Sequence, residues 1–133
     1  MDEVLDYLKK NVTYYLATID EDGNPRVRPF GTISKYNGDL LIQTGNVKDC
    51  FKQMAAHPRV ELCAFDDKAG TWLRVAADAI PVDSVEAREF VLDEYPSLKP
   101  RYAADDGNCE VLALRNVTAQ FCSFTTEPRV VTF

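Results

Sequence analysis

The chain has 133 residues, of which 46% are hydrophobic and 27% charged, a composition typical of a single globular domain covering residues 1–133. Its 15 basic and 21 acidic residues give a net charge of −6, which disfavours nucleic-acid binding because phosphate contacts need clustered Lys and Arg. No apolar run is long enough to span a membrane. The acidic start lacks an apolar signal core, so we expect a cytoplasmic protein with four reduced cysteines.

The first half of the chain alternates apolar and polar residues in short segments separated by turn signals. Asn37-Gly38 is typical of a tight turn between two strands, and His57-Pro58 is typical of a helix end. Short turns between neighbouring strands favour an antiparallel meander. In chain order we expect a helix over 2–10, strands over 14–19, 26–36 and 39–44, and a helix over 46–56 with Phe51, Met54 and Ala55 on its inner side.

The second half predicts a similar mixture of strands with one more helix. Asp83 followed by Glu86 resembles a capping box, and it opens a helix that runs to Tyr95. We expect strands over 59–65, 71–82, 109–124 and 129–133, and a loop over 96–108. Six or seven strands with three short helices at the joints predict a mainly β fold, a small antiparallel barrel.

Two segments contain the residues best suited to bind an anion. In a strand, Arg26 and Arg28 point to the same face, where two guanidinium groups repel each other unless an anion or carboxylates lie between them. Thr44 ends the next strand, and Lys48 falls in the first turn of the following helix, whose N-terminus favours negative charge. These residues would form a phosphate pocket if the hairpin places them together. The alternative is that both arginines pair with surface acids.

Pro29 interrupts the strand that contains both arginines. Proline donates no hydrogen bond to a ladder, so its position indicates either an edge strand or a bulge. A bulge beside Phe30 and Gly31 would leave backbone groups free and permit close approach of a flat ligand, whereas a twisted edge need bind nothing.

The only tryptophan, Trp72, shares a strand face with Arg74, opposite the most aliphatic side of that strand. An indole there could close a pocket, stack on a ring or cover a subunit interface, and the interface is the commoner case. With one histidine, no Cys-x-x-Cys pair and no nucleophile motif, the sequence predicts no metal site. An enzyme of this composition would take its chemistry from a bound cofactor.

The ordered segments YYLATIDEDGNPRVRPFGTI, LLIQTGNVKDCFKQMAAHPRVELCAF and TWLRVAADAIPVDS resemble the FMN-binding split barrel of the pyridoxamine 5′-phosphate oxidase-like family, over roughly residues 10 to 125. The resemblance implies a homodimer of six-stranded antiparallel split β-barrels with FMN at the interface. It also implies that Arg26, Arg28, Gln43, Thr44 and Lys48 bind the FMN phosphate, that Pro29, Phe30 and Gly31 line the ring, and that Trp72 and Arg74 close the site from near the dimer seam.

The implied activity is an FMN-dependent oxidoreductase that passes electrons from NAD(P)H to a small acceptor. The chain ends at FTTEPRVVTF, without the Arg- and Trp-containing terminus of the family's vitamin B6 enzyme, so we do not expect pyridoxamine 5′-phosphate oxidase activity itself. Two alternatives stay open: a non-enzymatic flavin carrier or sensor, and a relative that binds haem or deazaflavin F420.

Overall fold

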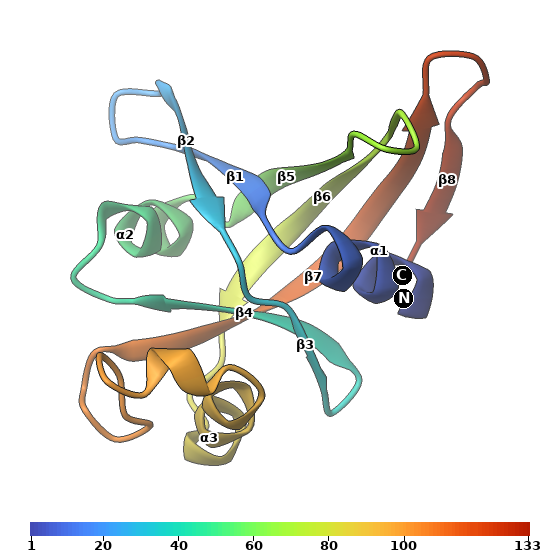
Figure 1. Ribbon diagram of the computed structural model, residues 1–133. Coiled ribbons are helices and arrows are strands. Elements are labelled where there is room, and N and C mark those ends of the chain that lie inside the picture. The colour runs from blue at the N-terminus through green and yellow to red at the C-terminus, as the bar shows by residue number, and fades with distance from the viewer.

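The computed structural model describes every residue from Met1 to Phe133. Figure 1 shows a strongly curved sheet with helices packed around it. No helix is long and apolar enough to cross a membrane. The helices are α1 (Asp2–Asn11), α2 (Asp49–Ala56), α3 (Val85–Glu94) and the short 3-10 helix η1 (Pro96–Leu98). The strands are β1 (Tyr14–Ile19), β2 (Pro25–Phe30), β3 (Ser34–Tyr36), β4 (Asp39–Gly45), β5 (Arg59–Asp66), β6 (Thr71–Pro81), β7 (Cys109–Ser123) and β8 (Arg129–Thr132).

All strand pairs are antiparallel, and together they form one sheet in the order β2-β1-β5-β6-β7-β4-β3, with β8 added to β7. This confirms the mainly β, antiparallel split-barrel prediction. There are eight strands where six or seven were predicted, because the expected strand over 26–36 divides into β2 and β3; the strand expected over 129–133 is present as β8. β2, which pairs with β1, and β3, which pairs with β4, are the two end strands of this order. They do not pair with each other, and residues 31–33 connect them along the chain.

The long strand β7 makes the sheet curve. Its first part pairs with β4 and its last part with β8, and the β6–β7 register shifts between Ala76 and Asp78. Such an irregularity bends a strand and increases its twist. At the opposite hairpin, Asn37 and Gly38 both have positive φ, as the predicted tight β3–β4 turn requires.

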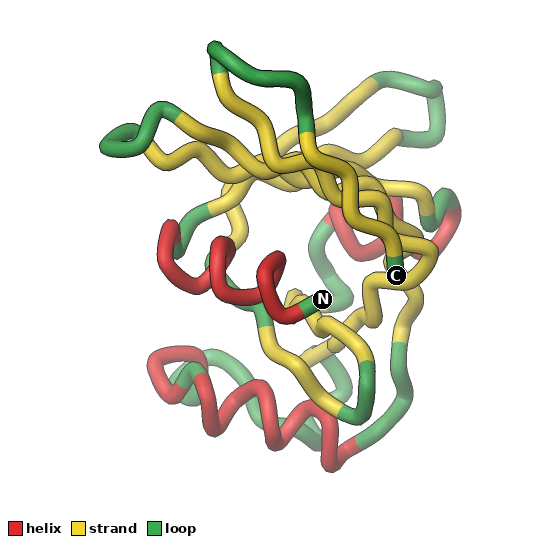
Figure 2. Tube along the Cα trace, turned by 90° about the vertical axis from the view of Figure 1, so that its right-hand side faces the viewer, coloured by secondary structure: helices red, strands yellow, loops and turns green.

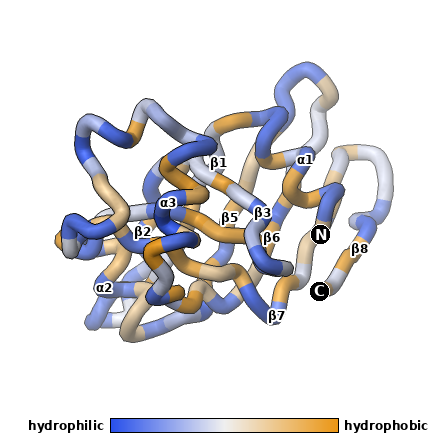
Figure 3. Tube along the Cα trace, turned by 90° about the horizontal axis from the view of Figure 1, so that it is seen from below, coloured by the Kyte–Doolittle hydropathy of each residue, from blue (hydrophilic) through white to orange (hydrophobic).

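The core lies inside the curved sheet. Twenty buried side chains form one cluster, including Leu16, Leu62, Leu73 and Leu112 from four different strands. Figure 3 shows hydrophobic residues concentrated along the strands and hydrophilic ones in the connections. In α2, Met54 is buried and Phe51 is partly buried as predicted, but Ala55 is exposed and Cys50 takes the inner position instead.

The helices close the open parts of the barrel. Figure 2 shows α1 between the upper strand layer and the β3–β4 hairpin. Four ion pairs hold it there: Lys35–Asp2 at 2.7 Å, Arg129–Glu3 at 2.8 Å, Lys10–Asp66 at 3.1 Å and Lys9–Glu94 at 3.2 Å. Helix α3 packs its Ala87 and Val91 on the outer face of β4 and β7, in a second small apolar cluster. The outer face of β2, β1, β5 and β6 is left without a covering helix.

Candidate functional site

One pocket brings most of the predicted anion-binding residues together. It has a volume of about 360 Å³ and lies between β2, the end of β4, the start of α2 and the segment after α3. That volume is within the range usual for small-molecule sites. Seven of the ten predicted site residues line it: Arg28, Pro29, Phe30, Gly31, Gln43, Thr44 and Lys48.

Arg28 is held in the pocket by neutral partners alone. Its Nη1 donates to Thr18 Oγ1 at 2.7 Å and to the Leu16 carbonyl oxygen at 3.2 Å, and its Nη2 donates to Gln53 Oε1 at 3.0 Å. These contacts fix the guanidinium against β1 and α2. None of them neutralises its charge, so Arg28 remains a positioned cation able to pair with an anion.

The end of β4 and the start of α2 supply further polar groups. Thr44 Oγ1 lies 3.5 Å from Cys50 Sγ, and both residues are buried where they line the pocket. Lys48 is the N-cap residue of α2, and it has no side-chain hydrogen bond to the first turn. The first N–H groups of a helix have no partner within the helix, so this end of α2 offers donors and a positive dipole beside the Lys48 ammonium.

The edge of β2 forms the flat side of the pocket. β2 pairs only with β1 and their register has no shift, so Pro29 lies in an edge strand and not at a bulge. The chain leaves the ladder after Phe30, and Tyr95 bridges the connection: its hydroxyl accepts from Ile33 N at 3.1 Å and donates to Ile33 O at 2.9 Å. Backbone groups on the free edge at Pro29, Phe30 and Gly31 are therefore available to a ligand.

The segment after α3 closes the other side of the pocket, and sequence reasoning missed it. Residues 96–108 were expected to be a plain loop, yet Ser97, Leu98, Arg101 and Tyr102 line the pocket. A Cβ on Gly45 would lie 3.0 Å from the Tyr102 hydroxyl, which shows how closely this segment packs against β4. Only the unpaired basic residue Arg101 could have marked the segment in the sequence.

The pocket is strongly positive in a protein that is negative overall. Ten of the 15 basic side chains form ion pairs with carboxylates. Of the five that do not, Arg28, Lys48 and Arg101 line this one pocket. No Asp or Glu lines it, although 21 of the 133 residues are acidic. Clustered cations without counter-charges are suited to bind an anionic ligand.

Arg26 lies outside the pocket. It shares the inward face of β2 with Arg28, as the strand periodicity predicted, but its Nε donates to Asp20 Oδ2 at 3.0 Å. Backbone N–H groups of Asn24 and Asp22, together with the Arg26 guanidinium, hold the pKa of the Asp20 carboxyl below its usual value. Of the two hypotheses for Arg26, pairing with a surface acid is therefore the one that the structure supports. The Arg26–Asp20 pair lines a second groove, which lies between the β1–β2 turn and α2.

Trp72 and Arg74 also lie away from the pocket, on the outer face of β6. Trp72 packs against Phe124 with ring centroids 4.9 Å apart, and Arg74 Nε donates to Glu61 Oε1 at 2.6 Å. Within one protomer neither residue can close the pocket. The only histidine, His57, is exposed at the end of α2 and lines the second groove rather than this one.

Comparison with known proteins agrees with the fold and shows the family. Residues 1–122 match the family described as pyridoxamine 5′-phosphate oxidase. The chain belongs to the pyridoxamine 5′-phosphate oxidase family. No curated protein gave a significant match.

Several solved structures are similar to this chain. A NimC/NimA family protein from Clostridium acetobutylicum is 39% identical, with a TM-score of 0.93 over 100% of this chain and 92% of that one. General Stress Protein 26 from Bacillus anthracis is 14% identical, with a TM-score of 0.78 over 99% and 97%. A heme binding protein from Mycobacterium smegmatis is 16% identical, with a TM-score of 0.73 over 95% of this chain and 57% of that one. The last two share the fold.

Proposed function

We propose that this member of the pyridoxamine 5′-phosphate oxidase family is an FMN-binding oxidoreductase that passes electrons from NAD(P)H to a small acceptor. The observation that carries the proposal is the pocket itself, which collects three cations without counter-charges beside an unpaired strand edge. A flavin mononucleotide has both of the groups that such a site suits, a phosphate and a flat polar ring.

The phosphate would be held where β4 meets α2. Arg28 and Lys48 supply positive charge, the Thr44 hydroxyl supplies a hydrogen bond, and the first turn of α2 supplies free N–H groups. Arg28 would need little rearrangement to bind the phosphate, because Thr18 and Gln53 already orient it.

The ring would lie along the free edge of β2. Pro29, Phe30 and Gly31 offer backbone groups to its polar edge, and Gly31 has open space where a side chain would stand. Gln43 is buried, and its Nε2 is already engaged by the Thr44 carbonyl oxygen at 3.1 Å, so we assign it a supporting role. Bound flavin supplies the hydride and electron chemistry, while these residues bind and orient it.

The uncovered sheet face supports a homodimer. Strand register places Tyr15, Val27 and Phe65 there, with 54%, 68% and 52% of their surfaces exposed. Trp72 lies opposite Phe65, and Arg74 lies opposite Cys63. A broad apolar face that carries aromatic residues favours an interface. A second copy on this face would bury Trp72 and Arg74 at the seam, so they would reach a flavin only as residues of the assembled dimer.

Among the alternatives, haem ligation is the less supported, because the pocket contains no histidine. The flavin carrier and the oxidoreductase share this site, so kinetics decides between them. Protein loaded with FMN is mixed with NADH or NADPH and a panel of quinone and nitroaromatic acceptors, and oxidation of the nicotinamide is followed by absorbance. We expect steady turnover with at least one acceptor. Stoichiometric FMN without turnover on the whole panel would favour the carrier.

A further inference from the structure

The connection between β2 and β3 has no main-chain hydrogen bonds of its own. No backbone N–H or C=O group of residues 31–33 pairs with another backbone group. Thr32 and Ile33 are nevertheless buried, with only 8% and 2% of their surfaces exposed. Leaving a buried backbone group without a partner costs free energy, because neither water nor the protein then replaces the lost hydrogen bond. Side chains must therefore hold this connection.

Two tyrosine hydroxyls, one on each side of the connection, fill this role. From β1, the Tyr14 hydroxyl donates to the Thr32 carbonyl oxygen at 2.6 Å. Burial raises the pKa of Tyr14, so the hydroxyl keeps the proton that it donates. From the end of α3, the Tyr95 hydroxyl accepts from Ile33 N at 3.1 Å and donates to Ile33 O at 2.9 Å. Tyr95 alone thus satisfies both backbone groups of a buried residue.

Tyr95 also belongs to the wall on the other side of the pocket. Leu98 N donates to the Tyr95 carbonyl oxygen at 3.0 Å, so Tyr95 starts the turn of η1. That turn places Ser97 and Leu98 at the pocket, and Tyr95 lines the pocket as well. The backbone of Tyr95 is therefore part of one wall, while its hydroxyl holds the connection that continues the strand edge of the other.

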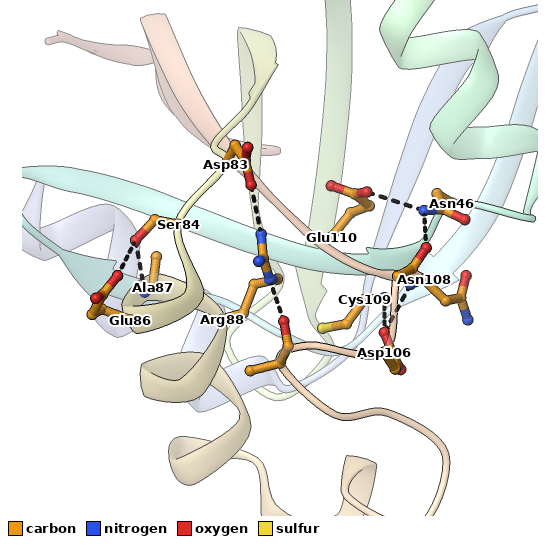
Figure 4. Close-up of polar contacts among 12 residues, drawn as sticks. Asn46, Asp83, Ser84, Glu86, Ala87, Arg88, Asp106, Asn108, Cys109 and Glu110 are labelled. Atoms are coloured by element: carbon orange, nitrogen blue, oxygen red, sulfur yellow. Dashed lines mark hydrogen bonds and ion pairs between the residues drawn. The ribbon is translucent and has the colours of Figure 1, made fainter.

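The wall that begins at Tyr95 is fastened to the rest of the fold. Figure 4 shows Arg88 of α3 reaching across to it, with Nε donating to the Ala104 carbonyl oxygen at 2.6 Å. At the far end of the wall, Asp106 accepts from the backbone N–H group of Cys109 at 2.7 Å. This fastening gives the Tyr95 hydroxyl a defined position, and the connection that it holds takes a defined position with it.

We propose that Tyr95 is a positioning residue for the flavin ring, acting through the backbone of the β2–β3 connection. The inference rests on the proposed FMN site. β2 ends at Phe30, and the backbone of Gly31 has no partner within the chain. Holding Ile33 fixes how the backbone of Phe30 and Gly31 faces the pocket, so the edge that meets the ring is set before FMN binds. A site ordered in advance loses less conformational freedom on binding.

The test compares Tyr95→Phe with Ser34→Ala, a matched control. Ser34 Oγ donates to Glu94 Oε2 at 3.1 Å, one residue along from the Tyr95–Ile33 contact. Both variants therefore remove a hydrogen bond between the same two segments, but only Tyr95→Phe releases the backbone of Ile33. FMN and riboflavin are titrated into each variant with flavin fluorescence as the signal, and inorganic phosphate is titrated as a competitor of FMN.

Tyr95→Phe should weaken FMN and riboflavin equally, by about tenfold, because the order that the hydroxyl supplied must then be supplied on binding. Inorganic phosphate needs only the cations at the start of α2, so its inhibition constant should be unchanged. The midpoint potential of bound FMN should shift in Tyr95→Phe, since hydrogen bonds to the ring tune it. Ser34→Ala should change neither the three affinities nor the potential.

Hydrogen exchange in the unaltered protein decides the question should Tyr95→Phe fail to fold, since that variant leaves two buried backbone groups unpaired. The Ile33 N–H group donates to the Tyr95 hydroxyl and to no other group, so its exchange rate reports this contact. We expect the Ile33 N–H to be protected equally with and without FMN. Protection that appears only when FMN is bound would show that the ring orders the connection, and would overturn the proposal.

Four binding results would also overturn the proposal. Unchanged flavin affinities in Tyr95→Phe would mean that the ring edge does not depend on the hydroxyl. Equal losses for phosphate and both flavins would mean that Tyr95 only supports the fold. A loss for FMN alone would place its effect at the phosphate end, and equal effects of Tyr95→Phe and Ser34→Ala would assign them to the docking of α3. Each of these refutes this inference alone, whereas an unaltered protein that binds no FMN would refute the proposed function as well.

Discussion

Replacing Lys48 by alanine should weaken FMN binding about tenfold while leaving riboflavin binding unchanged. The Lys48 side chain is exposed and forms no ion pair, so its removal leaves no buried group without a partner and the fold should be unaffected. A hydrogen bond to a charged group contributes roughly 1.5–3 kcal/mol. Water screens an exposed ammonium, so we expect the lower end of this range, and about 1.4 kcal/mol is a factor of ten.

Adding Arg28→Ala should have a larger effect, because Arg28 is partly buried and held in place. Its loss also removes the donor to Thr18 Oγ1 and Gln53 Oε1. We expect FMN affinity of the double variant to fall by about a hundredfold or more, from two charge-assisted contacts of roughly 1.5–3 kcal/mol each. The free energy of unfolding should fall by about 1–3 kcal/mol, because Thr18 Oγ1 and Gln53 Oε1 each lose a charged donor.

The assay compares two ligands that differ only in the phosphate. FMN and riboflavin are titrated into each variant at low and high salt, with flavin fluorescence as the signal, and Lys68→Ala is the control for removal of an unpaired cation elsewhere. The Lys48 effect should appear for FMN alone and shrink as salt rises. Equal losses for both flavins, or no loss for FMN, would refute the assignment of the phosphate to this end of the pocket.

Three other expectations concern the surroundings of the site. A Cβ at Gly45 would lie 3.0 Å from the Tyr102 hydroxyl, so Gly45→Ala should lower stability by about 1–3 kcal/mol, measured by thermal unfolding; an unchanged midpoint would contradict this close packing. Backbone N–H groups lower the pKa of Asp106 in the folded state, so its stabilising contribution is present above the unfolded value near 3.8 and is lost as pH falls through the lower folded value. The difference in urea stability between the unaltered protein and Asp106→Asn should therefore vanish below that range, and a difference that grows towards acid pH would reverse the sign. Finally, Val27→Glu combined with Phe65→Glu should halve the mass measured by light scattering, because both side chains lie on the uncovered sheet face; an unchanged mass would place the dimer interface elsewhere.

The local pattern of apolar and polar residues was sufficient to predict most of the helices and strands. Period-two alternation correctly placed Arg26 with Arg28 and Trp72 with Arg74 on common strand faces. It did not show that the strand expected over 26–36 divides, because the two parts pair with different neighbours that are distant in sequence. The cap of α3 was also misplaced by one residue: Ser84, rather than Asp83, accepts the hydrogen bond from Ala87 N at 3.1 Å.

The site was predicted best where its residues lie close together in the chain. Arg28 to Gly31 and Gln43 to Lys48 come from two segments that are close in sequence, and the curved sheet brings the end of β2 to the junction of β4 and α2. Arg101 and Tyr102 were missed because only tertiary packing against Gly45 brings their loop to the pocket. The place of Trp72 depends on an interface between two chains, about which strand periodicity carries no information.

The most direct test of the account is the visible absorption spectrum of the protein after incubation with FMN and removal of unbound ligand. The account predicts the two-band spectrum of oxidised flavin at one FMN per chain, with FMN rather than FAD released on denaturation. A protein that retains no flavin, before or after incubation, would contradict the central claim that the pocket of Arg28, Thr44 and Lys48 is a flavin phosphate site.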